Sequence, residues 1–112
     1  MIAKGQGASE VYNIGNWGTA TQTVDWDNGN NQYVSIDTSV SSLTLSNPIA
    51  GANYMIELIQ GGAGSNTVTW PASVKWANTT PPTLSTAVGK IDVISFFYDG
   101  TNYLGTYALN FG

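Results

Sequence analysis

Polar and apolar residues alternate along several short stretches of this chain, with the period of two that is typical of half-buried β-strands. The alternation is clearest in residues 91–98 (IDVISFFY) and looser in residues 19–26 and 32–37. Residues 53–60 (NYMIELIQ) are apolar on both faces, which favours a central strand or one at a subunit contact. No window shows the three- and four-residue apolar spacing of an amphipathic helix, so the pattern predicts an all-β chain.

Turn-forming residues separate these stretches and predict three hairpins. Residues 27–30 (DNGN) carry an Asn-Gly pair, which tolerates the positive φ values of a tight primed turn. The glycine-rich residues 61–65 would join 53–60 to a strand at 67–70, and Asp99-Gly100 would join 91–98 to the last strand. We therefore expect an antiparallel β-sandwich or jelly-roll-like domain of about eight short strands.

The stretch at residues 67–76 (TVTWPASVKW) combines two tryptophans with a proline. Pro71 has no N–H to donate, so a central strand cannot run through it. Val74 and Trp76 would then share one face of a short second strand, with Lys75 opposite. Burial of large aromatic rings is the commoner outcome. The residues we expect in the core or in assembly contacts are Trp70, Pro71, Val74, Phe96 and Tyr98.

Length and composition predict one domain. The 112 residues are close to the usual size of a single domain, and only 9% are charged against 42% hydrophobic. We expect residues 1–9 to form a flexible, glycine-rich lead-in, or the cut end of a longer chain, and residues 10–112 to form the β domain. No apolar run approaches the roughly 20 residues of a membrane-spanning helix, so no membrane insertion is expected.

The charged and reactive residues argue against several classes of function. A net charge of −4, with three lysines and no arginine, disfavours nucleic-acid binding. Cysteine and histidine are absent, which removes disulfides, thiolate chemistry and the usual general base near neutral pH. No basic segment followed by an apolar run marks a signal peptide. We expect no cofactor.

Two pairs of acids are candidates for the catalytic carboxylates of glycoside hydrolysis. Asp25 and Asp27 are two residues apart, and Asp27 begins the Asn-Gly turn, where aspartate is favoured for hydrogen bonding to the backbone. Glu57 and Asp92 lie in apolar strands, where each fits a satisfied buried carboxylate or a polar subunit contact. An ion pair from Lys75 or Lys90 to one of these two acids is a further expectation. We therefore expect no enzymatic activity.

Oxygen-bearing side chains also cluster on the Asn-Gly turn, and such side chains are the usual ligands of calcium ions. Their spacing does not match an EF-hand loop, so we expect no metal site. These residues are Asp25, Asp27, Asn28, Asn30 and Asn31.

Two motifs within residues 13–105 support a resemblance to a known family: TVTWPASVKW at 67–76 and GKIDVISFFYDG at 89–100. The sequence resembles a β-structural domain that recurs in bacteriophage tail-fibre and related virion appendage proteins. The resemblance implies a structural, trimeric module of a phage virion, as part of a tail fibre, a spike or a head decoration. It implies other virion proteins as partners and loops presented for host attachment, and it carries no catalytic motif.

A stand-alone carbohydrate-binding module is the alternative. A flat ring could stack on a sugar while asparagine and aspartate side chains bind its hydroxyls. Exposed, coplanar rings would favour this alternative, and buried rings would favour the structural role. The candidate glycan-contact aromatics are Trp17, Trp26, Trp76 and Tyr103.

Overall fold

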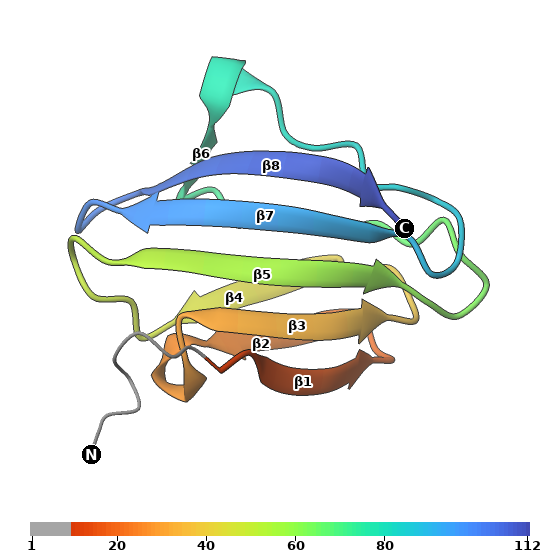
Figure 1. The fold of residues 1–112 in the computed structure, drawn as a ribbon. Helices are drawn as coiled ribbons and strands as arrows, with labels where there is room; N and C mark the ends of the chain where they lie inside the picture. Colours follow the sequence, from red (N-terminus) through yellow and green to blue (C-terminus); the bar gives the residue numbers. More distant parts are fainter. Residues whose placement is uncertain (1–9) are drawn as a thin grey trace.

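The computed structural model describes residues 10–112, which form eight β-strands and two short 3-10 helices (Figure 1). The all-β class and the number of strands predicted from the sequence are confirmed. The predicted lead-in at residues 1–9 lies outside the described residues. The strands are β1 (Tyr12–Trp17), β2 (Thr21–Asp25), β3 (Asn31–Ile36), β4 (Ser42–Ser46), β5 (Asn53–Gln60), β6 (Val74–Trp76), β7 (Ile91–Tyr98) and β8 (Tyr103–Phe111), and the helices are η1 (Trp26–Asn28) and η2 (Ala77–Thr79).

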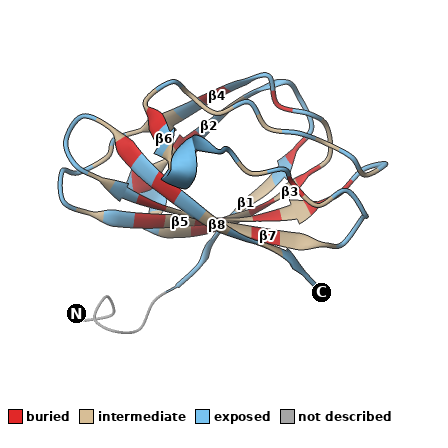
Figure 2. Ribbon diagram, turned by 90° about the horizontal axis from the view of Figure 1, so that it is seen from above, coloured by how far each residue is buried: buried red, intermediate tan, exposed pale blue. Residues whose placement is uncertain are grey.

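The strands form two sheets that lie in two layers (Figure 2). The larger sheet has six strands in the order β1-β3-β5-β7-β8-β6, and the smaller sheet pairs β2 with β4. Apolar side chains from both sheets are buried between the layers, as expected when alternate residues of each strand face inward. The most buried of them are Trp17, Val24, Val34, Ile36, Val40, Ile56, Leu58 and Ile94.

From β1 to β5 the chain passes back and forth between the two sheets, so it winds as a coil (Figure 1). A strand that returns to the same sheet after a full coil runs in the same direction as its predecessor. The pairs β1–β3, β3–β5 and β2–β4 are therefore parallel, as is β6–β8. Only β5–β7 and β7–β8 are antiparallel among the paired strands. The predicted antiparallel sandwich or jelly roll is thus wrong in strand direction.

The Asn-Gly turn after β2 does not form a hairpin, which corrects the prediction for residues 27–30. Residues 26–28 form helix η1, and the Asp25 carboxylate caps it by accepting a hydrogen bond of 2.9 Å from the Asp27 N–H. The buried Gln32 side chain donates 2.8 Å hydrogen bonds to the carbonyls of Asp25 and Gly29. The turn therefore moves the chain from the smaller sheet to the larger one.

The predicted hairpin between residues 53–60 and 67–70 is also absent. Strand β5 pairs with β3 and β7 instead. Residues 67–69 lie beside Val40, whose N–H donates to the Thr67 carbonyl and whose carbonyl accepts from the Thr69 N–H, both at 2.8 Å. By contrast, the predicted Asp99-Gly100 hairpin is confirmed between β7 and β8. There the Asp99 carboxylate accepts from the N–H groups of Asn102 and Thr101, and these hydrogen bonds lower its pKa.

Two amide side chains hold the segment after β5 in place. Gln60, which is 2% exposed, donates to the carbonyls of Ser85 at 2.7 Å and Asn66 at 3.1 Å, and accepts from the Asn66 N–H at 3.0 Å. The Asn66 side chain donates in turn to the carbonyls of Ile36 and Gly61. Buried backbone groups need such partners. These two residues therefore replace a regular strand pairing at this end of the fold.

Candidate interaction face

Three of the four aromatics considered for glycan contact are buried. Trp17 is 1% exposed, and Trp26 and Tyr103 are each 3% exposed. Trp76 is half-buried and meets Trp70 edge to face, with ring centroids 5.4 Å apart and an interplanar angle of 76°. Such rings do not form the exposed, coplanar platform that a sugar would need. The carbohydrate-binding alternative is without support at these residues.

The residues expected in the core or in assembly contacts surround one aromatic cluster. Phe96 and Val74 are buried, at 2% and 7% exposed, and Trp70 and Tyr98 are half-buried and pack against the core. Pro71 is half-buried beside Trp70. Gly105 leaves room for the cluster, because a Cβ atom there would lie 2.7 Å from the Trp76 ring.

Of the two acids near the Asn-Gly turn, Asp25 binds the backbone through its carboxylate. Hydrogen bonds from the Asn47 side chain and the Asp27 N–H lower the pKa of the Asp25 carboxyl group, because they stabilise its charged form. Asp27 is exposed. Within residues 10–112 there is no group of three or more acidic, histidine or cysteine side chains placed to hold a metal ion.

Glu57 and Asp92 lie on opposite faces of the larger sheet and do not form a pair. The register places Glu57 opposite Val93, whereas Asp92 lies opposite Leu58 on the inner side. Asp92 is 3% exposed and accepts hydrogen bonds from the N–H and hydroxyl of Ser85, both at 2.7 Å, and from the Asn110 N–H at 2.9 Å. Asp92 is thus a satisfied buried carboxylate, one of the two roles considered for it.

The predicted ion pair between these acids and a lysine is absent in the described part of the chain. Lys90 donates instead to the carbonyl of Gly112 at 2.7 Å. Lys75 is exposed on β6, and its neighbours Val74 and Trp76 face inward. Among the residues that the structure describes, neither Lys75 nor Glu57 has a side-chain hydrogen bond or an ion pair.

We call the side of the larger sheet that faces away from β2 and β4 the outer face, and it carries both apolar and polar residues. No other element of residues 10–112 lies over it (Figure 2). Residues that are opposite one another in the register share a face, which identifies its members. Its apolar members are Tyr33, Met55, Ile59, Ile91, Val93, Phe97, Leu104, Ala108 and Phe111.

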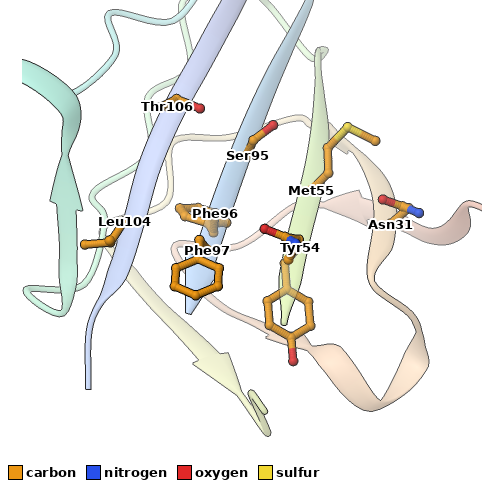
Figure 3. A pocket seen from close by; sticks show the side chains of 9 residues that line it. Asn31, Tyr54, Met55, Ser95, Phe96, Phe97, Leu104 and Thr106 are labelled. Atoms are coloured by element: carbon orange, nitrogen blue, oxygen red, sulfur yellow. The ribbon is translucent and has the colours of Figure 1, made fainter. Parts of the chain in front are cut away.

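A hollow with a volume of about 440 Å³ opens on the outer face across β5, β7 and β8 (Figure 3). Its apolar side chains include Met55, Phe97 and Leu104, and the latter two are 40% and 45% exposed. Polar groups at its margin include Asn31 and Thr106. The hollow offers mainly apolar contact surface, and no acidic or basic side chain lines it.

Sequence reasoning did not identify Phe97, Leu104 or Met55 as site residues. The one available signal was the apolar content of both faces of residues 53–60, which favoured a central strand or a subunit contact. The structure places this strand, β5, between β3 and β7 near the middle of the sheet. Its second apolar face therefore contributes to the outer face.

The fold and the outer face define an all-β domain with a sheet face that exposes large apolar side chains and is not covered by any other element of residues 10–112. Comparison with protein families matches residues 4–103 to the family described as "Putative phage tail fibre C-terminal domain". The chain belongs to this family. It is accordingly a domain of the virion, with a structural role there and in association with other virion proteins.

Comparisons with curated proteins and with solved structures gave no significant match. Neither of the helices in the described residues has the length and apolar character needed to cross a membrane.

Proposed function

We propose that this domain is a non-enzymatic structural module of a phage tail fibre that assembles as a homotrimer and presents its loops for host attachment. The observation that carries the proposal is the uncovered outer face, on which Phe97, Leu104 and Phe111 are 40%, 45% and 49% exposed. Large contiguous apolar patches on a protein surface mark contact with other molecules. The family supplies the setting, because its members are described as domains of tail fibres.

A three-fold assembly accounts for both the apolar face and the exposed strand edges. Burial of apolar surface contributes about 25 cal/mol per Å², so covering this face would stabilise an assembly substantially. The edge strands β1 and β6 also present unpaired backbone groups that tend to attract other strands. A ring of three identical subunits closes on itself and can cover these surfaces without forming open-ended fibrils.

The hydrogen bonds that three carboxylates make within the fold support a non-enzymatic role. Asp25 caps a helix, Asp92 accepts three hydrogen bonds in the core and Asp99 closes a hairpin. Each of these acids thus holds backbone or side-chain groups of the fold. Glu57 lies on the other side of the sheet from Asp92, so these two acids cannot flank one substrate.

Light scattering coupled to size-exclusion chromatography, near neutral pH and at moderate salt, tests the assembly. We expect a molar mass near three times the 11.8 kDa of one chain, because the outer face is buried between subunits. A monomer at micromolar concentration would contradict the proposal. Host attachment is tested separately, since isolated domain added in excess should reduce adsorption of the phage to its host cells.

A further inference from the structure

Two charged side chains point outward from the strands of the outer face, and they have opposite signs. Glu57 lies on β5 in the row that contains Val93 and Ala108. Lys75 lies on the edge strand β6, opposite Leu104 in the register, and its neighbours in sequence face inward. Two further charges, Asp37 and Lys90, flank the ends of strands and are already hydrogen-bonded.

Glu57 and Lys75 cannot meet within one chain. Three strand spacings separate β5 from β6. The register aligns Lys75 with Asn53 of β5, through Leu104 and Phe97 on the strands between them. Asn53 is four residues from Glu57 along β5. With strands about 4.8 Å apart and a rise of about 3.4 Å per residue, the two Cα atoms are roughly 20 Å apart. Even extended, the two side chains together reach only on the order of 10 Å.

An unpaired charge within an apolar face is costly to cover. Within residues 10–112 neither Glu57 nor Lys75 has an ion pair or a side-chain hydrogen bond, so no charge of the described fold compensates either of them. An apolar partner would strip water from both charges and leave them uncompensated. The occupant of this face must therefore bring a cation to Glu57 and an anion to Lys75.

We propose that the occupant is a second copy of this chain, with Lys75 of one subunit paired to Glu57 of its neighbour across apposed outer faces. This inference rests on the proposed assembly and specifies its contact surface. One face carries one charge of each sign, so two copies complement each other without a further partner. In a closed ring of three, Lys75 of each subunit pairs with Glu57 of one neighbour, and Glu57 of each subunit pairs with Lys75 of the other neighbour.

Exchange of the two charges tests this pairing, with molar mass by light scattering as the readout. The single variants Glu57→Lys and Lys75→Glu place like charges together across the interface, which is destabilising. We expect each to weaken association at least about tenfold and to shift the mass toward one chain. The double variant Glu57→Lys/Lys75→Glu restores opposite charges in every contact, and its mass should return to that of the wild type.

Asp27→Lys is the matched control, because it alters the net charge as much as Glu57→Lys does but at an exposed position within η1. Circular dichroism and thermal unfolding of every variant establish that each one is folded. A double variant that stays dissociated while folded would overturn the pairing. A wild-type trimer unaffected by either single variant would overturn the pairing while leaving the trimeric assembly standing. A wild-type monomer would overturn both proposals.

Discussion

Replacement of Trp26 by alanine is expected to lower the free energy of unfolding by about 3–5 kcal/mol, the usual cost of removing a buried tryptophan. Trp26 is 3% exposed and stacks on Tyr54 with ring centroids 4.4 Å apart. It also meets the edge of Phe96 at 6.3 Å. It lies in η1, where the chain leaves the smaller sheet for the larger one, so a cavity there would loosen both layers.

Chemical denaturation at one fixed protein concentration measures this effect, since association also contributes to apparent stability. The matched control is Trp26→Phe, which keeps an aromatic ring against Tyr54 and should cost roughly 1–2 kcal/mol. Equal losses for the two variants, or a loss below about 1 kcal/mol for Trp26→Ala, would show that the ring is not a central core contact.

The second large effect is expected at Gln60. In Gln60→Leu the side chain keeps its approximate size but loses three hydrogen bonds, two to the backbone of Asn66 and one to Ser85. Each buried group left without a partner costs about 1–3 kcal/mol. We therefore expect Gln60→Leu to reduce the free energy of unfolding by more than about 2 kcal/mol, again measured by denaturation.

Gln22→Leu provides the comparison for Gln60. The Gln22 side chain donates to the carbonyl and the hydroxyl of Thr19, but these bonds are exposed and water can replace them. Its loss should cost no more than about 0.5 kcal/mol. Similar losses at positions 22 and 60 would mean that water also satisfies the groups around Gln60.

The strands could be predicted from sequence, but their partners could not. Residues 53–60 and 91–98 form β5 and β7 within the predicted bounds, because a strand with one or two buried faces shows itself in local alternation. Polar and apolar residues alternate in the same way in parallel and antiparallel strands, so this pattern does not specify strand direction or pairing. The predicted hairpin at Asn28-Gly29 was wrong because the capping of η1 by Asp25 and the contacts of Gln32 redirect the chain.

The candidate site was predictable only in fragments. The alternation around Lys75 correctly set it opposite Val74 and Trp76, and residues 53–60 suggested a contact surface. That Lys75 and residues 53–60 contribute to the same face depends on the strand register, which also places Met55, Phe97 and Leu104 near one another. Burial of Trp17 and Trp26 likewise depends on two layers meeting, which no local pattern specifies.

The coil formed by β1 to β5 has a consequence for the rate at which the domain folds. Strands β7 and β8 are joined by a short turn and can pair early, whereas Tyr12 meets Gln32, and Asn31 meets Met55, only after a whole coil has closed. Closing such loops loses chain entropy before any contact is gained, which places folding on the millisecond-to-second scale or slower. Stopped-flow refolding should show this, and microsecond folding would contradict it. For a domain of a virion, the same topology favours slow formation and, if late contacts stabilise it, slow loss of structure.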